Sequence, residues 1–236
     1  GDEGNLYAPD ILVENGTYKM WYGAQSSEGH DSIHFATSDN GRNWIKHGVA
    51  IPKGENNHVN DPSVVKVNGT YYMYYTVAPI GIQDEIWLAT SGNGFNWSVH
   101  GIVLNQSADA EKWDSLKVGR PTVLYEDNTF KMWFDGSQRS ATHPTQVREG
   151  TGRHVGFATS ADGLSWTKHS ENPVFLNSGA IDVEKFDNQY LVLEESGGGI
   201  RYRLASNETD FPTTYKHLFN NTGTSFDCYG HVTPFA

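Results

Sequence analysis

Apolar and polar residues alternate along this chain in short runs that are separated by pairs of turn-forming residues. The run Asp10-Ile-Leu-Val before Asn15-Gly16, and the run Tyr-Lys-Met-Trp-Tyr after that pair, predict two antiparallel strands joined by a tight turn. No segment carries apolar residues at the alternating three- and four-residue spacing of an amphipathic helix. The pattern therefore predicts an all-β protein.

The same hairpin recurs along the chain, which indicates a repeat architecture. It occupies residues 9–22, 62–75 and 121–134, and a shortened copy without the Met-Trp signature occupies 181–194. A second hairpin follows each of the first three copies and ends at a tryptophan, at Trp44, Trp97 and Trp166. These tryptophans are 53 and 69 residues apart (97 − 44 and 166 − 97). Such intervals are typical of propeller blades that have four short strands each.

We therefore predict a single domain over residues 1–236, a five-bladed β-propeller of four-stranded antiparallel blades. The blades are expected at about 5–57, 58–110, 117–176 and 178–220, with a partial fifth blade at 229–236. A single fifth-blade strand would leave open sheet edges, which propellers avoid, so we expect the chain to be a fragment. The Thr-Ser-x-x-Gly-x-x-Trp turns that begin at Thr37, Thr90 and Thr159 resemble the Asp-box of sialidases. In such folds the turn is structural, so these turns predict the fold and not catalysis.

Composition excludes several classes of partner and chemistry. The chain has 17 Lys and Arg against 28 Asp and Glu, a net charge of −11, which disfavours binding to nucleic acid or to an anionic membrane surface. Cys228 is the only cysteine, so neither an intrachain disulfide nor a multi-cysteine metal site is expected. No segment is apolar enough to span a membrane, and no P-loop, catalytic-triad or zinc motif is present. We expect an extracellular or periplasmic protein.

Two columns of unusual residues flank the shared position of Pro9, Pro62 and Pro121 when the copies are aligned. The preceding column contains Ala8, Asp61, Arg120, Ala180 and His231, and the following column contains Asp10, Ser63, Thr122, Asp182 and Thr233. Positions two apart on a strand share a face, so we expect these side chains, together with Glu184, to form a charged ring around the propeller axis. The ring has two interpretations: a wet channel whose ion pairs orient the blades, or a carboxylate site that suits glycosidic hydrolysis.

The repeats resemble the five-bladed propeller glycosidases, a group that includes glycoside hydrolase families 43 and 32. Asn60-Asp61-Pro62 resembles the Asp-Pro start that carries a catalytic or pKa-tuning aspartate in these families. The resemblance implies an inverting glycoside hydrolase on oligo- or polysaccharides, in which Asp10 or Asp61 activates water. The catalytic candidates are Asp10, Asp61, Asp182 and Glu184. Where family 43 places its acidic glutamate, this chain has Arg120, so we expect Glu184 to replace that acid, and then Glu194 or Glu195.

The resemblance also implies substrate and ion contacts around the ring. Arg120 would grip a substrate hydroxyl, carboxylate or phosphate, and His231 resembles a fifth-blade histidine near the axis. No cofactor is required, but calcium occupies the channel of some relatives, and His231 is then a candidate ligand. Asp114 and His30 are further substrate-binding candidates, although a blade-joining turn is the favoured explanation for Asp114 and a solvated loop for His30.

Three other functions remain open at the level of sequence. A non-catalytic glycan-binding propeller is favoured by the missing third-blade glutamate. A glycoside phosphorylase would use Arg120 and His231 to bind phosphate. A sialidase would need an arginine cluster, and only Arg120 is suitably placed.

Overall fold

The computed structural model describes residues 3–26, 31–141, 152–196 and 199–220, and these residues form four successive four-stranded units. The first unit contains β1 (Glu3–Glu14), β2 (Thr17–Ser26), β3 (Asp31–Ser38) and β4 (Ile45–Ile51). The second contains β5 (His58–Val67), β6 (Thr70–Ala78), β7 (Glu85–Ser91) and β8 (Ser98–Leu104). The third contains β9 (Lys117–Glu126), β10 (Thr129–Ser137), β11 (Arg153–Ser160) and β12 (Thr167–Lys168). The fourth contains β13 (Ile181–Phe186), β14 (Gln189–Ser196), β15 (Gly199–Ala205) and β16 (Lys216–Asn220).

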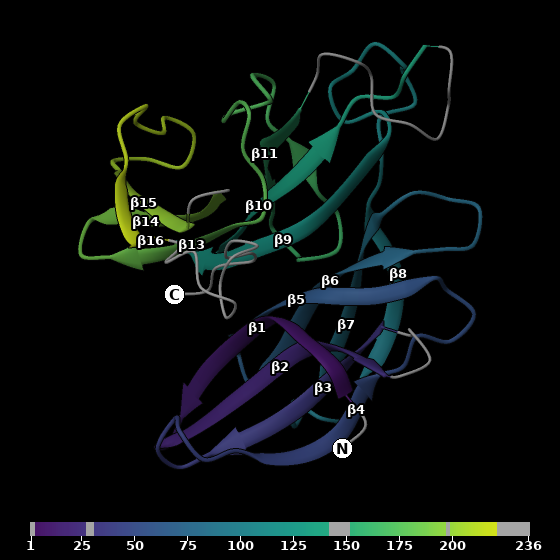
Figure 1. Ribbon diagram of the computed structural model, residues 1–236, viewed down its shortest axis with the longest axis vertical. Helices are drawn as coiled ribbons and strands as arrows, with labels where there is room; N and C mark the ends of the chain where they lie inside the picture. Colours follow the sequence, from purple (N-terminus) through teal and green to yellow (C-terminus); the bar gives the residue numbers. More distant parts are fainter. Residues whose placement is uncertain (1–2, 27–30, 142–151, 197–198, 221–236) are drawn as a thin grey trace.

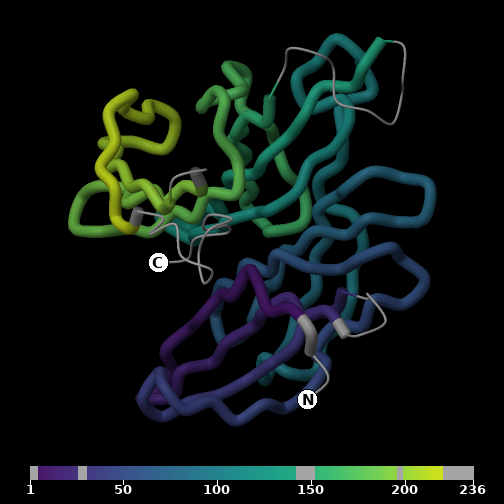
Figure 2. The backbone as a smooth tube through the Cα atoms, in the orientation of Figure 1, coloured from purple at the N-terminus to yellow at the C-terminus, as the bar shows by residue number. Residues whose placement is uncertain are grey.

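Every unit is an antiparallel meander, and the units follow one another around a common centre. Within each unit, neighbouring strands pair in sequence order. One parallel bridge, Asp31 to His58, joins the first unit to the second. The first strands of the units lie side by side, because β1 contacts β5, β5 contacts β9 and β9 contacts β13 (Figure 1). Figure 2 shows the chain passing through the units in sequence order, from purple to yellow. The prediction of an all-β fold is confirmed, and we call each unit a blade.

The tight turns follow from their sequences. Asn15-Gly16 has φ values of 50° and 80°, and Asn68-Gly69 has values of 49° and 84°. Positive φ at both central residues is typical of a type I′ hairpin turn, which favours Asn-Gly. Turn chemistry therefore explains the sequence at both positions.

Adjacent blades are joined by buried aromatic side chains from the second strand of each blade. Trp21, Tyr74 and Trp133 have no exposed surface. Each donates a hydrogen bond to a backbone carbonyl of the next blade: Trp21 Nε1 to Gly94 (2.7 Å), Tyr74 Oη to Gly163 (2.9 Å) and Trp133 Nε1 to Glu208 (2.8 Å). The core thus lies between blades, where each aromatic group fills space and satisfies a buried polar group.

The turns that resemble Asp-boxes have the structural role predicted for them. In the third blade, Ser160 Oγ accepts a hydrogen bond from the Gly163 amide at 2.9 Å. Asp162 Oδ1 accepts from the Leu164 and Ser165 amides, both at 2.8 Å. The same pattern recurs in the first two blades with Asn40 and Asn93. The side chains therefore cap the turns and are not free for catalysis.

The predicted number of five blades stays a prediction, because residues 221–236 lie outside the described residues. The first blade leaves part of one apolar face uncovered by the described chain. Met20, Tyr22 and Trp44 lie there, and they line a hollow of about 290 Å³. Across the described ranges there is no helix that is long and apolar enough to cross a membrane.

Candidate active site

The first three inner strands are interrupted at the position that the sequence alignment singled out, and the fourth, β13, begins directly after it. Ala8, Asp61, Arg120 and Ala180 all adopt a left-handed backbone, with φ between 47° and 49°. In the first three blades the residue that follows is proline, and the strand ladder shifts around the pair, as between Asn60 and Ser63. These are β-bulges, which tolerate proline because the amide at the bulge needs no ladder partner. Positive φ is unfavourable for residues other than glycine, and such strain is common at functional sites.

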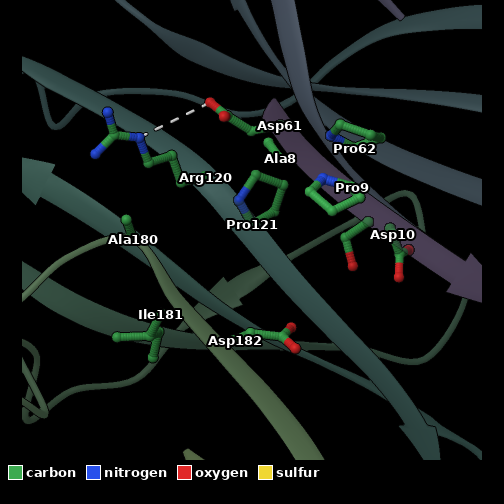
Figure 3. A pocket seen from close by; sticks show the side chains of 11 residues that line it. Ala8, Pro9, Asp10, Asp61, Pro62, Arg120, Pro121, Ala180, Ile181 and Asp182 are labelled. Carbon is green, nitrogen blue, oxygen red and sulfur yellow. Dashed lines mark ion pairs between the residues drawn. The ribbon is translucent and has the colours of Figure 1, made fainter. Parts of the chain in front are cut away.

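The three bulges and the start of β13 surround a small cavity at the centre of the molecule (Figure 3). Its volume is about 30 Å³, which is room for about one water molecule. It is lined by Ala8, Pro9, Asp10, Asp61, Pro62, Ser63, Arg120, Pro121, Ala180, Ile181 and Asp182. The columns predicted from the sequence therefore do converge, but the cavity between them is too small to hold a sugar.

The charged side chains separate into two groups on opposite sides of this ring of bulges. In Figure 3, Asp61 points toward Arg120 on one side, and Asp10 and Asp182 point away from that pair. The expectation that both columns share one strand face is therefore wrong. It assumed regular alternation, and the bulge between the two columns breaks that alternation.

The first group, which we call the entrance cluster, consists of Asp61, Arg120, Asp135, Arg153 and Glu195. Arg120 Nε lies 3.9 Å from Asp61, and Arg120 Nη1 lies 3.4 Å from Asp135. Arg153 Nη1 lies 3.1 Å from the same Asp135 oxygen, and Arg153 Nη2 makes an ion pair with Glu195. Negative and positive groups thus alternate in a row that crosses the second, third and fourth blades.

The charged side chains in this row differ in how deeply they are buried, and burial shifts the pKa values of the carboxyl groups. The side chain of Asp135 is 6% exposed and that of Asp61 is 12% exposed, whereas that of Arg120 is 34% exposed. Burial raises the pKa of Asp61, against the lowering effect of the Arg120 charge. Burial likewise raises the pKa of Asp135 to about 7, although Arg120 and Lys117 oppose it. Desolvation penalises the charged carboxylate, whereas the neighbouring positive charges favour it.

Three further charged residues flank the cluster: His58 and Lys117 begin the inner strands β5 and β9, and Asp84 directly precedes β7. His58 Nε2 lies 3.3 Å from Asp84, and Lys117 Nζ lies 3.7 Å from the other oxygen of the same carboxylate. The hydrogen bond to Asp84 raises the pKa of His58. Lys117, and His58 in its protonated form, bring positive charge near Asp61 and Arg120 while both are paired with Asp84.

The second group holds the blades together. Asp10 accepts a hydrogen bond from the Val64 amide of the next blade. Ser63 Oγ accepts from the Val123 amide at 3.0 Å, and Thr122 Oγ1 accepts from the Val183 amide at 3.2 Å. The residues in the column after the shared proline position therefore join neighbouring blades by hydrogen bonds. This favours the interpretation in which that column orients the blades.

Asp182 and Glu184 complete this inner group. Asp182 Oδ1 accepts a hydrogen bond from Thr122 Oγ1 at 3.0 Å. Burial and then the neighbouring Asp182 charge raise the pKa of Glu184 to about 7. The same two causes raise the pKa of Asp10 well above its usual range. Glu184 does not line the cavity, and the structure does not bring it together with Asp61 and Arg120.

The remaining predicted residues are not part of either group in the described structure. Asp114 is buried and its carboxylate lies 2.5 Å from Lys168 Nζ, so it joins two segments of the third blade and does not line the cavity. His30 and His231 lie outside the described residues. Among the residues that the structure describes, no group of three or more His, Cys, Asp or Glu side chains is arranged to hold a metal ion.

Sequence reasoning did not place Asp135 and Arg153 in the site. Another column of the alignment lies on the second strand of each blade, directly after the paired aromatic residues of the first three copies. It contains Gly23, Thr76, Asp135 and Glu195. The change from Gly and Thr to Asp and Glu was a visible signal.

Comparison with known proteins places the chain among carbohydrate-active propellers. Residues 53–207 match the family model described as "Glycosyl hydrolases family 32 N-terminal domain". A probable arabinan endo-1,5-alpha-L-arabinosidase B from Aspergillus oryzae is 31% identical over 133 residues, which are 50% of this chain and 36% of that protein. A 1,2-beta-oligomannan phosphorylase from Thermoanaerobacter sp. is 26% identical over 147 residues, which are 52% of this chain and 50% of that protein. The chain thus spans about half the length of such curated relatives, or less.

A solved structure described as "Glycoside hydrolase" superposes with a TM-score of 0.82 at 16% identity. The match covers 98% of this chain and 79% of that one. At this identity the likeness concerns the fold, and it agrees with the propeller arrangement of the sheets.

Proposed function

Because the chain belongs to the family of the glycosyl hydrolases family 32 N-terminal domain, we propose that it is a glycoside hydrolase whose reacting carboxylates are Asp61 and Glu195. The observation that carries this assignment is the row of ion pairs in the entrance cluster. This row of ion pairs ends at Asp61 of the second blade on one side and at Glu195 of the fourth blade on the other. Two separate carboxylates in different surroundings are what glycosidic hydrolysis requires.

The two carboxylates differ in the way an acid and a base must differ. The pKa of Asp61 is raised by burial, so this group suits the proton donor. Asp61 gives its proton to the glycosidic oxygen as the bond from that oxygen to the anomeric carbon breaks. Glu195, which is ion-paired with Arg153, accepts a proton from the water that attacks the same carbon. The products are two sugars with free hydroxyl groups, and solvent restores the two protonation states. One-step attack by water inverts the anomeric configuration.

Arg120 binds the substrate in this scheme. Its guanidinium group is held by Asp61 and Asp135, yet it is a third exposed. A planar group with several N–H donors can bind a sugar hydroxyl while it remains paired with a carboxylate. We therefore assign Arg120 to substrate binding next to the acid.

The test is sugar release from a panel that includes arabinan oligosaccharides and β-1,2-linked mannosides. Wild type is compared with Asp61→Asn and Glu195→Gln, and with Glu171→Gln as a control at an exposed position. We expect release by wild type and by the control, and a loss of at least about 10³-fold in each carboxylate variant that still folds. Normal release by either carboxylate variant would overturn the assignment. Glycan binding without release would indicate a non-catalytic carbohydrate-binding propeller.

A glycoside phosphorylase is the second candidate. Lys117 and His58 add positive charge beside Arg120, and phosphate could replace water as the attacking group. The relative from Thermoanaerobacter is named as a phosphorylase. Release that depends on added phosphate, and yields a sugar phosphate, would favour this candidate over hydrolysis.

A further inference from the structure

We propose that Asp135 is the positioning residue of the entrance cluster, holding the guanidinium groups of Arg120 and Arg153 so that Asp61 and Glu195 stand at a fixed separation. This inference rests on the proposed function, because it explains how the two carboxylates keep a productive geometry. Asp135 itself is too deeply buried to be assigned a reacting role.

The third blade builds this arrangement from three neighbouring strands. Asp135 lies on β10, opposite Gly119 of β9 and Val155 of β11. Arg120 is the bulge residue of β9, next to Gly119 in the chain. Arg153 is two residues from Val155 on β11, so it lies diagonally across from Asp135 on the same face. The central strand thus supplies the negative charge, and both flanking strands supply a guanidinium group.

One Asp135 oxygen, Oδ2, faces both arginines, at 3.4 Å from Arg120 and 3.1 Å from Arg153. With Asp61 on the far side of Arg120 and Glu195 on the far side of Arg153, each guanidinium group bridges two carboxylates. Removal of the central charge would leave two like-charged guanidinium groups next to each other. Each would then shift toward its outer carboxylate, and the spacing between Asp61 and Glu195 would change.

An independent observation comes from the loop that leads into the fourth blade. A Cβ atom added to Gly179 would lie 2.9 Å from Asp135 Oδ2 and 3.0 Å from Arg153 Nε. Real Cβ atoms essentially never make contacts shorter than 3.0 Å, so a side chain at this position would force the end of the Asp135 side chain to move. The absence of a side chain at Gly179 therefore permits the Asp135–Arg153 contact.

The experiment uses two variants that disturb Asp135 in different ways. Asp135→Asn keeps the shape of the side chain and removes its charge. Gly179→Ala keeps every charge and displaces the ion pair. Gly92→Ala is the matched control, because a Cβ atom there would meet nothing within 4 Å and its backbone is not left-handed.

Two readouts separate positioning from a structural role. The first is carboxyl titration by NMR with ¹³C-labelled aspartate and glutamate, and it needs no substrate. In Asp135→Asn the Arg120 charge acts on Asp61 without a competitor, so we expect the pKa of Asp61 to fall by about one unit. The second is steady-state kinetics, in which we expect kcat to fall about 10- to 100-fold in both variants with KM changed less than about 3-fold.

The outcomes distinguish this inference from the proposed function. An unchanged titration of Asp61 in folded Asp135→Asn would overturn the positioning role, whatever the activity. If that variant does not fold, Gly179→Ala decides, and a kcat equal to that of the Gly92→Ala control would overturn the role. If wild type releases no sugar, the proposed function fails, and the NMR titration alone decides whether Asp135 controls the charge of Asp61.

Discussion

Glu184→Gln should make the protein more stable at alkaline pH, and the gain should disappear in acid. Glu184 is half-buried on β13 beside Asp182, and its pKa is raised to about 7. A glutamate in an unfolded chain titrates near its ordinary value of 4.5. Between these two pH values the folded protein binds a proton that the unfolded chain has released. Folding therefore loses stability as pH rises from about 4.5 through 7.

The magnitude follows from the separation of the two pKa values. Each pH unit corresponds to about 1.4 kcal/mol, so the full difference sets an upper bound of roughly 3 kcal/mol. Because Glu184 is partly exposed, solvent screens its charge, and we expect about 2 kcal/mol at pH 8.5. Glutamine cannot ionise, so Glu184→Gln should not carry this cost. In a protein of this size the gain corresponds to a melting temperature higher by roughly 4–8 °C.

Urea unfolding monitored by tryptophan fluorescence, at pH 4.5 and pH 8.5, measures the effect. The control is Glu171→Gln, which changes an exposed glutamate on the loop between β12 and β13. We expect the difference between wild type and Glu184→Gln to grow with pH, whereas the control follows wild type. An equal dependence on pH in wild type and Glu184→Gln would refute the argument. A variant that is less stable than wild type at pH 8.5 would refute it as well.

The other predictions concern the joints between blades and the substrate side of the site. Trp133→Phe removes the hydrogen bond to the Glu208 carbonyl and should lower the free energy of unfolding by about 1–2 kcal/mol, measured in urea. Gly163→Ala places a Cβ atom 2.7 Å from Tyr74 Oη at a residue with φ of +75°, and should cost about 2 kcal/mol or more in the same assay. Arg120→Lys keeps the charge but loses the fork of donors, so kcat/KM for a released sugar should fall about 10- to 100-fold. Unchanged values would contradict each argument.

Much of the fold was predictable because it follows from local sequence patterns that repeat along the chain. The Asn-Gly pairs predict type I′ turns, and the recurring Met-Trp and Gly-x-x-Trp signatures mark the second and fourth strands of a blade. Trp21, Tyr74 and Trp133 occupy one column of the alignment, and all three are buried between blades. The resemblance to propeller glycosidases is borne out by the family match.

The candidate site was only partly predictable, because its geometry depends on departures from regular structure. The columns that contain Asp61 and Asp10 do meet at one cavity. A bulge in the inner strand of each of the first three blades sends them to opposite sides, and the regular alternation of a strand does not predict such a bulge. Glu195 was considered only after Glu184, since its position on a second strand gave no hint of its ion pair with Arg153.

The sequence by itself determined the all-β class, the repeating four-stranded blades, their turns and the aromatic residues that join them. These features arise from contacts between residues that are close in sequence or equivalent in the repeat, so one chain suffices to read them. Only the tertiary structure decided which charges act together. The distance from Arg120 to Asp135 and from Arg153 to Glu195 depends on how three strands and two blades approach each other, and burial in that arrangement, not residue type, raises the pKa of Asp61 and of Asp135.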